Sequence, residues 1–417
     1  MTDFNRIVRD ISKNNREPDW LLDLRLNALK SFETTPPPAR NEEEWRKADL
    51  NRILFSDLDV YSDTAPSKIA LTGDAPKGVF AGTLSQAAKD IPGIVRPYLE
   101  RSQVHNARKY DALVNALWNG GVFVHVPENV RAELPVSMSL KPMTARSGDL
   151  KSSYFPKRIV VLEKNSSLTL VSEETSDEGW GGWIGSQTEI VLKAGAKLSM
   201  VRTQLSDRKS TIISSFYSTL ERDASLDLIV VSAGSALNKS NWSTDIIGLG
   251  ASAHVYGLVT GEGTQNFDHS VLLTHQVPQT SSNVLFKTAM KDKSRSLFTG
   301  LIHVWKVAQK TEAYQTNRNL LLSREARADT IPKLEIEADD VKCGHGAAVS
   351  NVDPDQIYYL MTRGLSREQA QAIIIEGFYE DVLAKFLENS SGTPQAKEGL
   401  LAYFHRILFG GKQTVAV

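Results

Sequence analysis

Short strand-like segments recur between residues 150 and 338, and this recurrence restricts the fold more than any other feature of the sequence. Each segment has a polar or glycine corner, a small residue and then alternating apolar positions, as in NSSLTL, GAKLSM, DASLDL, GASAHV, KSRSLF and EARADT. The small residues are spaced by 30, 28, 27, 43 and 32 residues and are Ser166, Ala196, Ala224, Ala251, Ser294 and Ala326. Such a loose repeat favours the stacked coils of a β-solenoid, with an antiparallel sandwich as the alternative.

Helical patterns occupy the N-terminal part of the chain. Apolar residues recur at helical spacing from Trp20 to Phe32, and the TTPPPAR linker then stops the helix because three prolines cannot continue it. EEEWRKADL and KYDALVNALWNGG predict further short helices, whereas VFVHV and PVSMSL predict the first strands. We therefore expect an N-terminal helical and mixed domain over residues 1–148, followed by a strand-rich core over residues 149–348.

The last part of the chain returns to helical patterns, which predicts a C-terminal helical domain over residues 349–417. Asp353 and Ser366 are expected to cap two helices, the second through a capping box. The apolar face of this second helix consists of Ile373, Ile374, Phe378 and Val382. LLAYFHRILF predicts a third amphipathic segment. Such faces usually pack on their own domain, and docking of a partner is the alternative.

Composition argues against several classes of function. The chain has 48 basic and 49 acidic residues, so no global field attracts it to nucleic acid or to anionic lipid. Its opening segment lacks the apolar core of a signal peptide, and no window reaches the roughly 18 apolar residues that span a bilayer. A single cysteine excludes an internal disulfide framework. We expect a cytoplasmic protein without nucleic-acid or membrane partners.

Motifs for nucleotide binding are incomplete. The segment GGKQT at 410–414 has Gln413 where a phosphate-binding loop needs a hydroxyl after its lysine. The segment GLGASA at 248–253 precedes a strand-like pattern instead of a helix. His269 and His275 would share one face of a strand, and they are interpreted as core or surface residues in preference to metal ligands. The sequence therefore predicts that the chain itself binds no nucleotide.

The lone cysteine lies in LEIEADDVKCGHGAA, whose alternation over residues 334–343 predicts one strand, interrupted only at the two adjacent aspartates. Side chains alternate by two along a strand, so Cys343 and His345 should project from the same face, while Gly344 points away. A thiolate beside an imidazole suits a nucleophile with its base, a redox thiol or two ligands of a soft metal. A buried thiol beside a capping histidine is the structural alternative. An iron-sulfur cluster typically needs four protein ligands, so this chain would have to share one.

The run from Lys310 to Phe378 resembles the SufB/SufD family of iron-sulfur cluster assembly scaffolds, and it lies nearer to the SufD branch. Its most specific parts are VKCGHGA and the preceding QTNRNLL at Gln315–Leu321. EPDWLLDLRLNALKSF, EEEWRKADL and SRSLFTGLIHV are similar to other parts of that family. The resemblance implies a mainly β protein, namely a right-handed parallel β-helix flanked by helical N- and C-terminal domains. It also implies a non-catalytic scaffold.

The same resemblance implies partners and a shared site. A SufB-type paralogue would share the β-helix interface, and SufC-type ABC ATPases would bind the C-terminal helical region. A transient iron-sulfur cluster would form between a cysteine of the SufB side and a histidine of the SufD side, which is His345 here, with Cys343 ranked second. Flavin binding is associated with the assembled complex, although the sequence contains no flavin motif. The residues expected to bind partners are Asp353, Tyr359, Arg363, Phe378 and Val382.

Three alternatives remain at this point. Gly344 replaces the serine usual in SufD-like motifs, and Glu17–Trp20 has some similarity to the SufB branch, so a scaffold that forms a homodimer with itself is one alternative. A β-helix enzyme acting on polysaccharide is the second, although carboxylates do not recur at one position of the repeats. An independent mononuclear metal protein using His345, Cys343 and strand histidines is the third.

Overall fold

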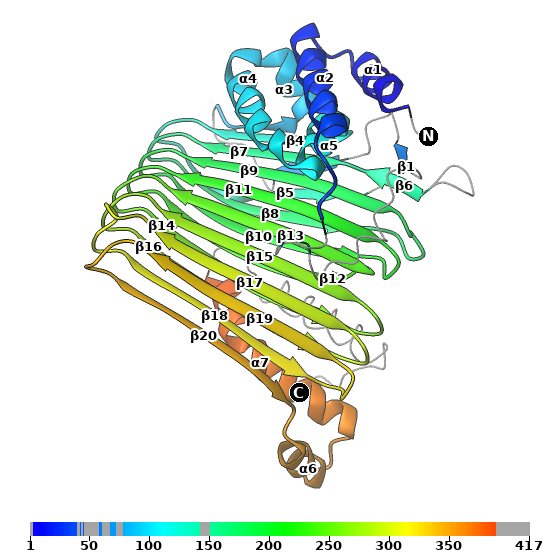
Figure 1. Cartoon of the computed structure of the whole chain (residues 1–417), viewed down its shortest axis with the longest axis vertical. Coiled ribbons are helices and arrows are strands. Elements are labelled where there is room, and N and C mark those ends of the chain that lie inside the picture. Colours follow the sequence, from blue (N-terminus) through cyan, green and yellow to red (C-terminus); the bar gives the residue numbers. More distant parts are fainter. Residues whose placement is uncertain are drawn as a thin grey trace.

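Two long β-sheets form the body of the molecule, and the chain passes alternately from one sheet to the other (Figure 1). The computed structural model describes residues 3–39, 42, 45, 58–60, 67–71, 78–141 and 151–388. All pairings between strands from β7 to β20 are parallel. This arrangement confirms the predicted parallel β-solenoid with helices at both ends and excludes the antiparallel sandwich.

The eleven-strand sheet contains β1 (Leu58–Val60), β3 (Phe80–Thr83), β4 (Gly120–Val126), β6 (Lys151–Tyr154), β7 (Pro156–Leu162), β9 (Trp183–Leu192), β11 (Thr211–Leu220), β13 (Leu237–Ile246), β15 (Asn266–His275), β17 (Arg295–Val304) and β19 (Arg327–Ile336). The nine-strand sheet contains β2 (Ser67–Leu71), β5 (Arg131–Leu140), β8 (Ser167–Thr175), β10 (Lys197–Ser206), β12 (Ser225–Gly234), β14 (Ser252–Gly261), β16 (Ser281–Met290), β18 (Glu312–Leu321) and β20 (Lys342–Asn351). From β8 onward, each coil contributes one strand to each sheet.

Alternating side chains explain why the coils stack. In β12, Leu226, Leu228 and Val230 point into the space between the two sheets and are buried. In-register parallel pairing places the same side of every strand inward, so these apolar positions form continuous columns. Each fully buried leucine or valine contributes roughly 1.5–3 kcal/mol. The interior between the sheets is therefore the main core of the molecule.

The repeat alignment drawn from the sequence was wrong at one step. Ser166, Ala196, Ala224 and Ala251 all lie buried just before strands of the nine-strand sheet. Ser294 and Ala326 instead precede β17 and β19 of the eleven-strand sheet. The interval of 43 residues therefore spans one coil, from Ala251 to Thr280, and then half of the next. Both corners of a coil need a tight turn followed by a small buried residue, so the local pattern could not distinguish them.

One corner shows why glycine is needed there. Gly250 has a φ of +75°, and a Cβ at this position would lie 2.2 Å from Asp223 Oδ1 in the preceding coil. Asp223 itself has a positive φ, and its N–H donates to the carbonyl of Leu249 at 2.9 Å. Stacked corners are therefore joined by a backbone hydrogen bond, and the positive φ of Gly250 is a conformation that residues other than glycine rarely adopt.

Helices cover the beginning of the solenoid (Figure 1). They are α1 (Phe4–Asn14), α2 (Asp19–Thr34), α3 (Leu84–Asp90), α4 (Pro92–Arg101), the 3₁₀-helix η3 (Ser102–Ala107) and α5 (Lys109–Leu117). Their apolar side chains form one cluster with outward-facing residues of the early eleven-strand sheet, including Ile159, Val161 and Trp183. The predicted helices over Trp20–Phe32 and over KYDALVNAL are thus confirmed. The EEEWRKADL helix cannot be compared, because of its residues the structure describes only positions 42 and 45.

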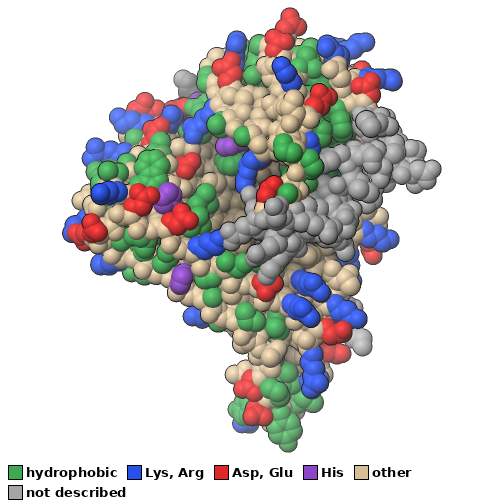
Figure 2. Space-filling view, in the orientation of Figure 1, with side chains coloured by type: hydrophobic (Ala, Val, Ile, Leu, Met, Phe, Trp, Pro, Cys, Tyr) green, Lys and Arg blue, Asp and Glu red, His purple; other side chains and the backbone are tan. Residues whose placement is uncertain are grey.

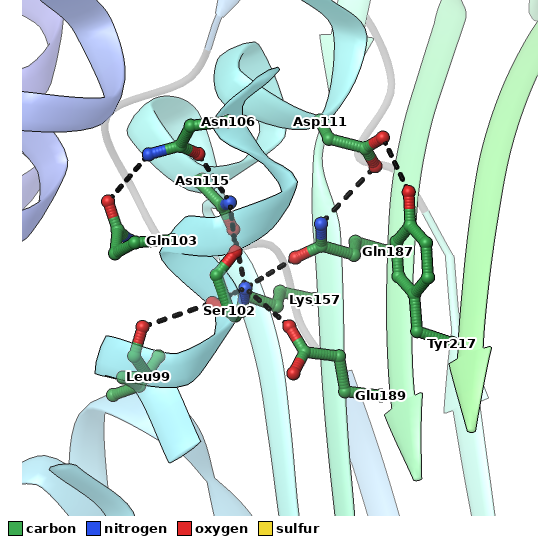
Figure 3. Close-up of polar contacts among 10 residues, drawn as sticks. All are labelled: Leu99, Ser102, Gln103, Asn106, Asp111, Asn115, Lys157, Gln187, Glu189 and Tyr217. Carbon is green, nitrogen blue, oxygen red and sulfur yellow. Dashed lines mark hydrogen bonds and ion pairs between the residues drawn. The ribbon is translucent and has the colours of Figure 1, made fainter. Parts of the chain in front are cut away.

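A buried polar network joins these helices to the sheet (Figure 3). The Lys157 ammonium on β7 donates to Ser102 Oγ at 2.7 Å, to Asn115 Oδ1 at 2.5 Å and to Gln187 Oε1 at 2.5 Å. The carboxylate of Asp111 accepts from the Gln187 side-chain amide and from the Tyr217 hydroxyl, at 3.2 and 2.8 Å. Burial lowers the pKa of Lys157 and raises the pKa of Asp111. Each group nevertheless has partners, so the network fixes how η3 and α5 lie on the sheet.

Among the described residues, two helices follow β20, namely α6 (Pro354–Thr362) and α7 (Arg367–Glu388). The Asp353 side chain caps α6. Ser366 and Gln369 form the predicted capping box, since each side chain accepts from the other's backbone N–H, at 3.2 and 2.8 Å. The predicted starts of both helices are therefore confirmed. The LLAYFHRILF segment lies outside the described residues.

The predicted boundary between residues 148 and 149 lies in the segment 142–150, which is also outside the described residues. Strands on both sides of this segment share the same sheets, because β4 pairs with β7 and β5 pairs with β8, both in parallel. Within the described part of the chain, no helix combines the length and the apolar character needed to cross a bilayer.

Candidate functional site

The strands β19 and β20 form the terminal coil of the solenoid. β20 pairs with β18 and ends the order of the nine-strand sheet, while β19 pairs with β17 and ends the path of the eleven-strand sheet. Each of these strands thus has one edge without a neighbour among the described strands. Cys343 and His345 both lie on β20, so the sequence-predicted ligands are placed at this end of the molecule.

The prediction of one continuous strand over residues 334–343 was wrong. β19 ends at Ile336, β20 begins at Lys342, and the residues between them form a corner. At this corner the N–H of Lys310 donates to the Asp340 carbonyl at 2.6 Å, and the N–H of Asp340 donates to Gln309 Oε1 at 2.9 Å. Apolar residues before and after the corner pack into one cluster. For this reason the alternation of apolar and polar residues in the sequence continues across the corner. The corner was marked only by the two aspartates that interrupted the pattern.

Cys343 is half-buried beneath this corner. It pairs in register with the buried Ala313 on β18 and packs in a small apolar cluster with Ala308, Leu334 and Val341. Burial raises the pKa of the Cys343 thiol, an effect larger than the opposing backbone hydrogen bond at Ala313. The thiol is therefore held mainly in its protonated form at neutral pH, and a bound soft metal would have to displace that proton.

His345 is exposed and lies two residues further along β20. Its partner in register is Gln315, whose side chain is buried and donates to the Lys333 carbonyl on β19 at 2.8 Å. Paired residues of parallel strands point the same way, so Cys343 and His345 continue two inward-facing columns of the solenoid. Their Cα atoms are roughly 7 Å apart in an extended strand. Both side chains can therefore approach a ligand bound against the terminal coil.

The glycines around His345 act on the opposite face of β20. A Cβ added to Gly344 would lie 3.3 Å from Cδ1 of Tyr314, so the glycine admits this half-exposed ring. At Gly346 the nearest atom would be Thr316 Oγ1 at 3.8 Å. The space that these glycines leave is thus not directed at Cys343 and His345. Instead it leaves the outer face of the last strand nearly flat.

The strand histidines do not join this site. His275 is buried, with Nδ1 2.8 Å from Thr280 Oγ1 and Nε2 2.9 Å from Ser282 Oγ. His269 is also buried, and burial lowers the pKa values of His269 and His275 to about 3 and about 4. Both are neutral core residues, as the sequence suggested. Within the residues that the structure describes, no group of three or more His, Cys, Asp or Glu could hold a metal.

The five residues expected to bind partners fall into two environments. Tyr359 on α6 and Arg363, which directly follows this helix, are exposed, and an Arg363 guanidinium nitrogen donates to the Tyr359 hydroxyl at 3.2 Å. Val382 is fully buried, because α7 packs on the outer face of the nine-strand sheet. Phe378 is partly buried in the same cluster, and its carbonyl accepts from the Lys287 ammonium at 2.6 Å. Asp353, as described, caps α6.

Sequence reasoning missed two exposed apolar residues on α6. Tyr358 is 70% exposed and Met361 is 41% exposed, and both lie close to Tyr359. Figure 2 shows hydrophobic side chains at the tip of the molecule where α6 lies. The sequence signal that could have identified this surface was the spacing of three residues between Tyr358 and Met361, which places them on one side of a helix. These residues form an apolar surface outside the chain's own core.

Two family models match the chain. The model described as "SUF system FeS cluster assembly, SufBD core domain" matches residues 143–378, and the "SufBD protein N-terminal region" matches residues 58–138. The first covers more than half of the chain and includes the terminal coil, the corner and most of α7. The match therefore extends over the whole solenoid and is not limited to the motif around the lone cysteine.

Similar proteins cover most of the chain. The iron-sulfur cluster assembly protein SufD of Bacillus subtilis (strain 168) is 28% identical over 410 residues, which cover 90% of this chain and 92% of the relative. The SufB protein of the same strain is 25% identical over 417 residues, with coverage of 90% and 87%. An iron-sulfur cluster assembly SufBD family protein of Staphylococcus haemolyticus (strain JCSC1435) is 24% identical, with the same coverage. This chain belongs to the SufBD family of iron-sulfur cluster assembly proteins.

Proposed function

We propose that this chain is a non-catalytic, SufD-like scaffold of the cytoplasm that pairs through its terminal coil with a SufB-type paralogue. In this proposal His345, with Cys343 as a second ligand, contributes to a nascent iron-sulfur cluster that is later transferred. The observation that carries the proposal is the position of both residues on β20, at the end of the nine-strand sheet.

The chemistry of the terminal coil supports sharing of the cluster. Strand edges such as those of β19 and β20 are templates for pairing with another chain. A thiol and an imidazole are soft ligands that suit iron-sulfur chemistry, but a cluster typically takes four protein ligands. The chain has one cysteine in total. The remaining thiolates would therefore come from the paired chain.

A SufC-type ABC ATPase is the second proposed partner, and α6 is its proposed contact. The exposed residues Tyr358, Tyr359, Met361 and Arg363 combine aromatic, apolar and cationic groups on one short helix and at its C-terminal end. Aromatic residues and arginine are enriched at protein interfaces. Since the only Gly-Lys segment near a phosphate-loop pattern lacks the required hydroxyl residue, the ATPase would supply nucleotide hydrolysis.

Pairing with a second copy is a second candidate, and a charge pattern on β19 favours it. The outward-facing residues of β19 are Arg327, Asp329, Ile331, Lys333 and Glu335. Antiparallel pairing of two copies about Ile331 would place Arg327 opposite Glu335 and Asp329 opposite Lys333. Pro332 opposes this arrangement, because its missing N–H removes one donor from the free edge. Self-pairing would therefore rely on side chains more than on backbone hydrogen bonds.

Coexpression with a candidate SufC-type ATPase and a SufB-type paralogue, followed by native mass measurement, tests the proposal. We expect one complex containing all three chains. We also expect that His345→Ala leaves this complex intact and lowers the visible absorbance of its reconstituted cluster several-fold, with a smaller loss for Cys343→Ser. His303→Ala is a matched control, since His303 lies on the outer face of β17 and pairs with Glu337 at 3.0 Å.

Three results would contradict the proposal. Unchanged cluster yield in His345→Ala would remove this residue from the site. A stable dimer of this chain alone, which excludes the paralogue, would favour self-pairing. Retention of a complete cluster and hydrolysis of ATP by the isolated chain would contradict the scaffold role itself.

A further inference from the structure

A cavity of about 540 Å³ lies between η3 and the outer face of the eleven-strand sheet, away from Cys343 and His345. Its roof includes Val104, His105 and Arg108, and its floor extends over β11, β13, β15, β17 and β19. Small-molecule sites in proteins typically measure roughly 300–1,000 Å³. This cavity therefore has the size of a binding site for a small organic molecule.

The floor of the cavity contains an ordered row of side chains. Tyr217, Ser243, Leu272, Leu301 and Lys333 pair in register across five consecutive strands of the eleven-strand sheet. Neighbouring strands are about 4.8 Å apart, so the row extends over roughly 19 Å. Apolar side chains occupy its middle, and the cationic side chain of Lys333 lies at the end that belongs to the terminal coil. A second row beside it offers polar groups, including Ser270 and Thr299.

The opposite end of the row is also cationic. A guanidinium nitrogen of Arg108 lies 3.5 Å from the Tyr217 hydroxyl and donates to it. The His105 ring stacks on the Tyr217 ring, with centroids 3.5 Å apart and planes 7° from parallel. Burial and the nearby cations lower the pKa of His105 to about 4, so it adds no charge at neutral pH. The stack makes a rigid, neutral aromatic wall beside Arg108.

The charge in the lining of the cavity is positive. It includes Arg108 and Lys333 and, as far as the described residues go, no carboxylate. The carboxylate of Asp111 lies behind the wall, where it accepts from the Tyr217 hydroxyl, and the charge of Arg108 acts on it. Apolar contact with Val104, which is 69% exposed at the roof, adds to that of the two leucines. An apolar body would bury surface here, and an acidic group would be attracted to either end.

We infer that this cavity binds a small amphiphilic organic anion, whose apolar body lies over Leu272 and Leu301 and whose carboxylate, sulfonate or phosphate group contacts Arg108 or Lys333. The inference is independent of the proposed function, because it uses neither the terminal ligands nor a partner chain. It adds a ligand site on the outer face of the eleven-strand sheet, to whose lining neither Cys343 nor His345 contributes.

The test uses two fluorescent probes that differ by one group. 1-Anilinonaphthalene-8-sulfonate carries a sulfonate, and N-phenyl-1-naphthylamine is the same ring system without it. We expect the purified full chain to bind one equivalent of the sulfonate at least tenfold more tightly than the neutral probe. Lys333→Gln and Arg108→Gln together should weaken binding of the sulfonate about tenfold while leaving the neutral probe unaffected.

Leu301→Asp should remove binding of both probes, because it places a carboxylate in the apolar part of the row. Val307→Asp is the matched control, since Val307 is an exposed apolar residue at a corner outside the cavity, and it should change neither affinity. Melting temperatures show whether each variant folds. If Leu301→Asp fails to fold, Thr299→Asp, which also places a carboxylate in the cavity, is used in its place. Equal affinity for the two probes would overturn the preference for an anion. Unchanged binding in every cavity variant would overturn the site.

Discussion

At its first coils the solenoid lies under helices and a buried polar network, whereas its last coil ends in two strand edges with half-exposed side chains. On the covered end, Lys157 has three hydrogen-bond acceptors and is fully enclosed. On the terminal coil, Cys343 is half-buried and His345 is exposed, although both occupy columns that are buried in earlier coils. The same repeating coil is thus covered by packed helices at one end of the solenoid, whereas at the other end nothing described covers its inward-facing side chains and strand edges.

This difference indicates where substitutions should affect folding and where they should affect assembly. Groups at the covered end are held by contacts within the chain, so their loss should destabilise the fold itself. Groups on the terminal coil and on α6 make fewer such contacts, and their loss should leave the isolated chain folded. Stability and partner-dependent readouts therefore separate the two ends.

Lys157→Ala should have the largest effect. It leaves the buried acceptors of Ser102, Asn115 and Gln187 without their common donor, and it removes the cation that lies 3.6 Å from the buried Glu189 carboxylate. Breaking a buried ion pair costs roughly 3–5 kcal/mol. Chemical unfolding followed by circular dichroism measures this loss. Lys310→Ala is the comparison near the terminal coil, because its exposed ion pair with Asp340 should contribute less than about 1 kcal/mol. Similar losses in both variants would contradict the contrast between the two ends.

Val382→Asp should have the next largest effect. The side chain is fully buried where α7 packs on the nine-strand sheet, so an unpaired carboxylate there should cost about 2–4 kcal/mol and release the helix. Hydrogen exchange of α7 would report this release, and capture of the proposed SufC-type ATPase would report its consequence for the proposed assembly. Ile373→Asp is the control, because Ile373 is partly exposed on the same helix. Slow exchange of α7 in Val382→Asp would contradict the packing.

The sequence predicted the class of fold because alternation and small corner residues are local signals. It predicted that Cys343 and His345 share a face for the same reason. It did not predict the corner after Ile336, because apolar residues continue across it into one small cluster. It favoured packing of the Val382 face on its own domain but left docking of a partner open, since an apolar helix face has the same pattern whether its own sheet or a partner covers it.

The polar network around Lys157 could not be predicted either. Its members come from η3, α5, β7 and β9, and Asn115 and Lys157 are separated by 42 positions. A lysine within a strand-like segment gives no sign that its ammonium is buried. The cavity under η3 could not be predicted for the same reason, because the row from Tyr217 to Lys333 becomes continuous only when the coils stack.

Acid should destabilise the coils through two histidines. His269 and His275 have pKa values lowered by burial to about 3 and about 4, whereas unfolded histidine titrates near 6.5. Below about pH 6.5 the unfolded chain binds protons that the folded chain excludes, so this contribution is complete above pH 6.5 and is lost as the pH falls toward 4 for His275 and toward 3 for His269. Each histidine contributes up to about 1.4 kcal/mol per pH unit. Urea unfolding at pH 7, 6 and 5 measures the slope, and an unchanged slope in His275→Gln would contradict this assignment.

Gly344→Ser should have the smallest effect. Its Cβ would lie 3.3 Å from the ring of Tyr314, a contact that the ring can relieve because it is half-exposed. We expect a loss below about 1 kcal/mol, and a still smaller one for Gly346→Ser, where the nearest atom lies at 3.8 Å. At the covered end, a Cβ on Gly182 would lie 2.2 Å from the Ser152 carbonyl oxygen, so Gly182→Ala should cost much more. If thermal unfolding shows equal losses for these three variants, the terminal coil is as tightly constrained as the first ones, and incomplete packing cannot explain why Cys343 and His345 are accessible.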